Sequence, residues 1–237
     1  LLTGSVQPTL YHEQSPATAD PATYLLGLRD EMTKRWPRNR TINIVCHGHS
    51  VPAGYFKTPT VDTFNAYPHL LHVALKKRFP HAVINVIVTS VGGEESERGS
   101  KRFDRDVLSM RPDLITIDYG LNDRRLGLQR SRKAMESMLK TARKNKIPVI
   151  LLTPTADQRS KLTDPKDPLT QQAEFLRKLA ATHRVGLADS FAAFLTKIAA
   201  GKPLAKLMSQ SNHPNRAGHE LVVNELLKWF PSAKKGP

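Results

Sequence analysis

The stretch TINIVCHGHS, residues 41–50, begins as a short apolar run and ends in a serine that follows Gly48. Such a run of six residues, bounded by turn residues, is typical of a buried strand. Similar runs predict four further strands, at 82–89, 113–119, 148–153 and 185–188. Apolar residues at helical spacing predict helices between and after them, at 67–79, 94–110, 130–145, 169–183, 191–199 and 216–229.

This alternation of strands and helices predicts the α/β class. Strands linked by helices pair in parallel through right-handed crossovers, and the helices then cover both faces of the sheet. We therefore expect a three-layer α/β/α sandwich with a five-stranded parallel sheet. The length suits a single domain over 1–237, with a core at about 41–230 and an extended N-terminal segment at 1–21.

The charge is strongly positive, with 36 Lys and Arg against 21 Asp and Glu, a formal net charge of +15. The basic residues occur as scattered pairs such as Lys76-Lys77 and Arg124-Arg125, without a long basic block or interleaved aromatic residues. We therefore expect a solvated basic surface and no nucleic-acid partner. Attraction to an acidic surface or polymer stays open.

Other features bound the compartment only weakly. Cys46 is the one cysteine, so no intrachain disulfide can form, and its apolar neighbours predict a buried thiol. No stretch approaches the roughly 20 apolar residues that a membrane helix needs, so we expect a soluble protein without an integral membrane segment. The start at Leu1 without methionine is compatible with export after signal removal, and neither compartment nor oligomeric state is decided.

In open parallel sheets, ligands bind at the carboxyl ends of the strands. Four segments there carry side chains or glycines suited to chemistry. Ser50 follows the first strand on a turn, and Gly92-Gly93 follow the second. Asn122 follows the third strand with an amide that can donate to an oxyanion, and His213 stands in a late Pro-containing turn where a general base could lie. Each alone is typical of an ordinary turn or helix cap.

Together, and in this order, these residues resemble the four blocks of the SGNH (GDSL-like) hydrolase superfamily, over about 41–229. The resemblance implies a flavodoxin-like fold, Ser50 as nucleophile within Gly48-His49-Ser50, and His213 as base. It further implies an oxyanion hole formed by the backbone N–H groups of Ser50 and Gly93 and the amide of Asn122. No cofactor is implied.

Two positions depart from the family pattern. His49 stands where the family usually has Asp, and Gln210 stands where an acid is expected three residues before the histidine. Gln210 could orient His213 through its carbonyl oxygen, but it cannot supply a negative charge. The substitute acid that we can name is Asp189, for which a helix N-cap before Phe191 is the alternative role.

Two more groups of residues have open interpretations. His47 and His49 form an H-x-H pair that could face one way, yet no further ligand stands at short spacing, so we expect no metal site but substrate contact or hydrogen-bonded loop histidines. The aromatic and basic residues after the serine could line an acyl or sugar pocket or simply pack the loop; they are Tyr55, Phe56, Lys57 and Tyr67.

The expected function is hydrolysis of a small acyl ester through an acyl-serine intermediate, with an O-acetyl group on a carbohydrate as the favoured substrate by analogy. Lipid esters and thioesters fit the same mechanism. The competing hypothesis is a catalytically impaired SGNH-like protein that binds carbohydrate or an anionic polymer, for which Gln210 is the best sequence support.

Overall fold

The computed structural model describes residues 18–231, so residues 1–17 of the predicted N-terminal segment lie outside the described part. Five parallel strands form the main sheet in the order β2-β1-β3-β4-β5. They are β1 (Thr41–Gly48), β2 (Val83–Val88), β3 (Leu114–Asp118), β4 (Val149–Leu152) and β5 (Gly186–Ala188). The predicted five-stranded sheet is confirmed, and its order is that of flavodoxin-like folds.

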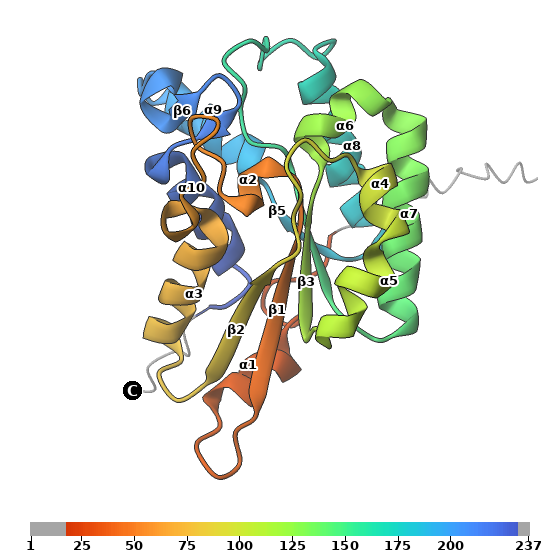
Figure 1. The fold of residues 1–237 in the computed structure, drawn as a ribbon, viewed down its shortest axis with the longest axis vertical. Helices are drawn as coiled ribbons and strands as arrows, with labels where there is room; N and C mark the ends of the chain where they lie inside the picture. The colour runs from red at the N-terminus through yellow and green to blue at the C-terminus, as the bar shows by residue number, and fades with distance from the viewer. Residues whose placement is uncertain (1–17, 232–237) are drawn as a thin grey trace, which may run out of the picture.

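Helices cover both faces of this sheet (Figure 1). One face carries α3 (Tyr67–Arg78), α9 (Ser190–Ala199) and α10 (Arg216–Leu227). The other carries α4 (Ser96–Lys101), α5 (Phe103–Asp106), α6 (Gly120–Leu126), α7 (Leu128–Lys144) and α8 (Pro168–His183). The remaining elements are α1 (Leu26–Thr33), α2 (Ser50–Ala53), a small hairpin of β6 (Met208–Gln210) and β7 (His213–Pro214), and 3₁₀ turns at Thr63–Asn65, Leu108–Met110 and Leu204–Leu207.

The strands divide their side chains between two hydrophobic cores, as the alternation of strand residues requires. Ile44 and Cys46 of β1 enter the core beneath α3 and α10, whereas Val45 enters the core beneath α7 and α8. Full burial of each such aliphatic side chain stabilises the fold by about 1.5–3 kcal/mol. Burial also raises the pKa of the Cys46 thiol to about 12, so Cys46 behaves as the predicted small hydrophobe.

The single helix predicted at 94–110 is wrong. The chain there forms α4, α5 and a 3₁₀ turn, with Arg102 between α4 and α5 at φ −107° and ψ 5°. The Arg102 guanidinium binds the carboxylate of Glu94 and donates to the carbonyl of Thr89 at 2.6 Å. These contacts with the segment after β2 reorient the chain, and local periodicity does not encode them.

The carboxyl ends of β1, β2 and β3 approach one another closely. The Val91 N–H, just after β2, donates to the Gly48 carbonyl at the end of β1 at 3.0 Å. A Cβ added at Gly48 would lie 2.4 Å from the carbonyl oxygen of Asp118, the last residue of β3, so only glycine fits there. This edge therefore gathers the segments that carry Ser50, Gly93 and Asn122. Within residues 18–231, no helix combines the length and apolarity needed to span a bilayer.

Candidate active site

Ser50 opens α2 directly after the buried strand β1. His49 is the N-cap of this helix, and its Nδ1 accepts the Val51 N–H at 3.1 Å. Gly54 ends the helix in the left-handed region at φ 91°. As the first helical residue, Ser50 has a backbone N–H without an intrahelical acceptor. Ser50 as a residue is 6% exposed, so little of it is accessible to solvent.

His213 contacts the serine directly, although 163 residues separate them. Its Nε2 lies 2.9 Å from Ser50 Oγ, and its Nδ1 lies 2.9 Å from the carbonyl oxygen of Phe56. A carbonyl oxygen can only accept, so Nδ1 carries the proton and Nε2 has a lone pair facing the serine hydroxyl. This is the tautomer that a general base for Ser50 requires.

The His213 imidazole is held neutral. Desolvation by burial lowers its pKa from the ordinary value of 6.5, the hydrogen bond to the Phe56 carbonyl opposes this shift, and His49 adds to it. A neutral imidazole at neutral pH can accept a proton from Ser50.

Gln210 does not contact His213 in the way the sequence suggested. Its Oε1 accepts the backbone N–H of Thr58 at 2.9 Å, and its Nε2 donates to Asn212 Oδ1 at 3.2 Å. The prediction that the Gln210 carbonyl oxygen orients His213 is therefore wrong, because the backbone carbonyl of Phe56 bonds the imidazole instead.

Asp189 is the N-cap of α9, as its alternative reading held. Its Oδ1 accepts the Ala192 N–H at 3.1 Å and the Thr153 hydroxyl at 2.8 Å, and its Oδ2 accepts from Arg177 at 2.7 Å. With both oxygens bound to these partners, Asp189 is not a substitute acid for His213.

Gly93 and Asn122 line one hollow of about 280 Å³. Gly93 adopts φ 73°, a conformation that favours glycine, and its N–H has no acceptor among residues 18–231. Asn122, in the first turn of α6, donates one Nδ2 hydrogen to the Glu94 carbonyl at 2.8 Å. The second Nδ2 hydrogen is available to a ligand. The two residues that the family resemblance assigns to the oxyanion hole thus lie together.

The H-x-H pair does not act as one unit. His47 bonds Thr89 Oγ1 at 2.9 Å and the Gly99 carbonyl at 3.2 Å, and burial lowers its pKa to about 4. His49 turns its Nε2 towards Asp118 Oδ1 at 3.3 Å, without hydrogen-bond geometry. Both histidines are fully buried, so substrate contact is excluded and hydrogen-bonded structural roles remain. Within residues 18–231, no three His, Cys, Asp or Glu side chains gather as a metal site.

Two groups that shape the site were not predicted from the sequence: the side chain of Asp118 and the backbone carbonyl of Phe56. Asp118 lies at the end of β3, 2% exposed, facing the Nε2 proton of the His49 that caps α2. An aspartate at the end of the apolar run 113–119 could have suggested a partner for His49, which stands where the family usually has Asp. Every residue has a backbone carbonyl, so the hydrogen bond that Phe56 accepts from His213 could not be predicted from the sequence.

Most of the aromatic residues after Ser50 pack against other side chains and do not line a pocket beside it. The Phe56 ring stacks on His219 at 5.2 Å between centroids, and Tyr67 is fully buried in the core. Tyr55 lies 6.0 Å from the His213 ring, between centroids, and beside Gly92, which leaves it as the aromatic side chain near the pair. Lys57 is exposed.

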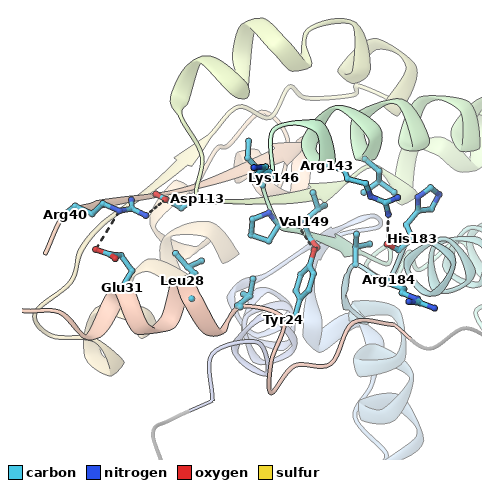
Figure 2. Close-up of a pocket in the computed structure, with 16 residues that line it drawn as sticks. Tyr24, Leu28, Glu31, Arg40, Asp113, Arg143, Lys146, Val149, His183 and Arg184 are labelled. Atoms are coloured by element: carbon cyan, nitrogen blue, oxygen red, sulfur yellow. Dashed lines mark hydrogen bonds and ion pairs between the residues drawn. The ribbon is translucent and has the colours of Figure 1, made fainter.

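A cavity of about 540 Å³ lies at the opposite end of the sheet, at the amino ends of β3, β4 and β5 (Figure 2). Tyr24 crosses its floor, donating to the Val149 carbonyl and accepting the Val149 N–H, and Arg40 pairs with Asp113 at 2.7 Å (Figure 2). Its lining holds no serine or cysteine beside a histidine. Ser50 and His213 lie at the other edge of the sheet.

Comparisons with known proteins identify the family and the fold. Residues 46–221 match the model of the GDSL-like Lipase/Acylhydrolase family. No curated protein sequence matches the chain significantly. Among solved structures, Axe2, an acetylxylan esterase from Geobacillus stearothermophilus, has a TM-score of 0.70 at 19% identity, over 82% of this chain and 97% of that chain. A two-domain esterase (CEX) active on acetylated mannans has a TM-score of 0.70 at 20% identity, over 94% of this chain and 58% of that chain. At these identities the likeness shows a shared fold.

Proposed function

The chain belongs to the GDSL-like Lipase/Acylhydrolase family and is a serine hydrolase of carboxylic esters, and on this premise we propose that Ser50 is its nucleophile and His213 its general base. The observation that carries the proposal is the 2.9 Å contact between Ser50 Oγ and His213 Nε2, with the other ring nitrogen bonded to the Phe56 carbonyl. Geometry, tautomer and a lowered His213 pKa all suit proton abstraction from the serine.

The reaction proceeds in two halves. Ser50 Oγ attacks the acyl carbonyl carbon while His213 Nε2 takes the hydroxyl proton. The tetrahedral intermediate collapses, His213 returns the proton to the leaving alcohol, and an acyl-serine remains. Water then attacks the acyl carbon while His213 takes one of its protons. The bond from the acyl carbon to Ser50 Oγ breaks, His213 returns the proton to Oγ, and the carboxylic acid leaves.

The developing oxyanion is stabilised by three donors. They are the N–H at the start of α2, the N–H of Gly93, and the free amide hydrogen of Asn122. The bond from Asn122 to the Glu94 carbonyl fixes the amide before substrate arrives, so little reorganisation accompanies the reaction.

Gln210 is a positioning residue in this account. The N–H of Thr58, which Gln210 accepts, lies two residues after the carbonyl that orients His213. Gln210 therefore holds the loop that holds the imidazole. The imidazolium formed during the reaction meets a carbonyl dipole where most relatives supply a full negative charge.

The substrate that we propose is a small acyl ester, specifically an O-acetyl group on a carbohydrate. Axe2 is an acetylxylan esterase and CEX is active on acetylated mannans, and both share this fold. Ser50 is only 6% exposed, and the Tyr55 ring lies 6.0 Å from the His213 ring that contacts Ser50, which supports a small acyl group.

Hydrolysis of p-nitrophenyl acetate by the purified wild type tests the proposal, beside Ser50→Ala and His213→Ala. Ser137→Ala is the matched control, because Ser137 is an exposed serine on α7. We expect turnover in the wild type and in Ser137→Ala, and loss of at least about 10³-fold in the two site variants. Equal turnover in all folded proteins would reject Ser50 and His213.

The alternative, a binding protein that has lost turnover, predicts no hydrolysis by any folded form. Its main support was Gln210, and the bond from His213 to Phe56 weakens that support because the imidazole is oriented without an acid. The same assay separates the two hypotheses.

A further inference from the structure

The hollow lined by Gly93 and Asn122, two of the three proposed oxyanion donors, also contains two arginines. Gly93 and Asn122 share it with Glu95, Arg125, Leu126 and Arg130. A group bonded to the acyl carbonyl must enter or border this hollow if the oxyanion lies where the proposed function requires. The charges here therefore act on the part of the substrate next to the scissile ester.

Arg125 is the arginine in this hollow that forms no ion pair with a carboxylate of residues 18–231. Arg130 pairs with Glu97, its Nη2 lying 2.6 Å from Oε2. Glu95 is fixed as the cap of α4, with Oε2 accepting the N–H groups of Glu97 and Arg98. No carboxylate within residues 18–231 lies within ion-pair distance of Arg125, which is exposed at the end of α6.

A second group of arginines lies next to the segment that carries His213. Arg124 and Arg159 both bind Oδ2 of the buried Asp157, at 2.6 and 2.8 Å. One carboxylate cannot neutralise two guanidinium groups, so the cluster keeps one positive charge. The Gln158 N–H donates to the Ser211 carbonyl at 2.8 Å, which joins this loop to the segment carrying His213.

We propose that the ester is carried by an anionic glycan, whose acidic groups bind Arg125 and the neighbouring Arg124–Asp157–Arg159 cluster. Guanidinium groups bind carboxylate, sulfate or phosphate oxygens through paired N–H donors. The formal charge of +15 adds long-range attraction for such a polymer. This inference rests on the proposed function and narrows its substrate class.

Equilibrium binding to the non-hydrolysing Ser50→Ala protein tests the inference. The probes are O-acetylated oligogalacturonate, which carries carboxylates, a sulfated O-acetylated manno-oligosaccharide, and its neutral unsulfated parent. Calorimetry at about 50 mM and about 500 mM NaCl reports charge dependence, since the Debye length falls from about 14 Å to about 4 Å. We expect an anionic probe to bind at least about tenfold more tightly than the neutral one at low salt.

Arg125→Ala and Arg38→Ala, each in the Ser50→Ala background, locate the effect. Both remove one exposed arginine, but Arg38 lies before β1 at the amino end of the sheet. Loss of the anionic preference in Arg125→Ala alone supports the subsite, and the carboxylated and sulfated probes tell which anion it takes. Equal binding of all probes, or equal effects of the two substitutions, overturns it.

These outcomes are independent of turnover. Charge-selective binding together with no p-nitrophenyl acetate hydrolysis by the wild type rejects the proposed function and keeps the subsite. Hydrolysis together with equal binding of anionic and neutral probes supports the proposed function and rejects the subsite.

Discussion

Gln210 and Thr58 are joined by a 2.9 Å hydrogen bond from the Thr58 backbone N–H to Gln210 Oε1. Through it, the residue standing where the family usually has an acid supports the loop of Phe56 and not the imidazole itself. The His213 Nδ1 proton goes to the Phe56 carbonyl. The imidazole that contacts Ser50 thus keeps its orientation without a carboxylate.

Gln210→Ala should lower kcat for p-nitrophenyl acetate about fivefold, since the loss of one hydrogen bond of about 1 kcal/mol loosens the loop. Gln210→Glu should keep kcat near the wild-type value, because a carboxylate also accepts the Thr58 N–H. Gln171→Ala, an exposed change on α8, is the control. If Gln210→Ala and Gln171→Ala behave alike, Gln210 has no positioning role.

The pH dependence of kcat/KM should show one acid limb whose midpoint lies below 6.5. Hydrolysis needs neutral His213, and burial holds the pKa of its imidazole below 6.5, so activity is lost only as pH falls through that lowered pKa. Rates from pH 4.5 to 8 check this. In Gln210→Glu the midpoint should rise, because a nearby carboxylate favours the imidazolium. A wild-type midpoint above 6.5 would point to an acid partner instead of the Phe56 carbonyl.

Asn122→Ala should lower kcat by about 10²–10³ with a smaller effect on KM, as expected for a donor that acts on the oxyanion. Its Nδ2 also donates to the Glu94 carbonyl, so thermal unfolding is measured alongside to separate catalysis from stability. Asn224→Ala, an exposed change on α10, should leave both unchanged. A fall in KM-based affinity with kcat intact would assign Asn122 to substrate binding.

The free energy of unfolding should fall as pH decreases from 6.5 to about 4. Burial lowers the pKa of His47 from 6.5 to about 4 in the folded protein, so in this window the unfolded chain binds a proton that the folded chain does not. The contribution of neutral His47 to the free energy of unfolding is fully present above pH 6.5. Its loss lowers the free energy of unfolding by about 3 kcal/mol by pH 4. Urea unfolding at a series of pH values measures it. His47→Gln should reduce the slope in this window, to which the buried His219 also contributes, and an unchanged slope would exclude His47 as a cause.

The fold was predictable because its five strands are bounded apolar runs and its long helices are periodic. The runs at 41–46 and 148–153 correspond to β1 and β4 within a few residues. The predicted helix at 94–110 failed because Arg102 bonds Glu94 and Thr89, contacts that depend on tertiary structure.

Only the parts of the candidate site that depend on side-chain type could be predicted from the sequence. Ser50 and His213 meet, and Gly93 and Asn122 share a hollow, because strand exits converge at one edge of a parallel sheet. The carbonyl of Phe56 gave no signal, since every residue has one. The partner of Gln210 lies 152 residues away, so no spacing rule reveals it.

Fluorophosphonate labelling followed by intact-mass measurement tests whether Ser50 is the nucleophile, because the reagent reacts with the nucleophile itself and needs no knowledge of the natural ester. We expect one adduct on the wild-type protein, mapped by peptide fragmentation to Ser50, and none on folded Ser50→Ala. We also expect slow labelling of His213→Ala, which lacks the base. An unlabelled wild type, or an adduct that persists in Ser50→Ala, would contradict the claim that Ser50 is the nucleophile.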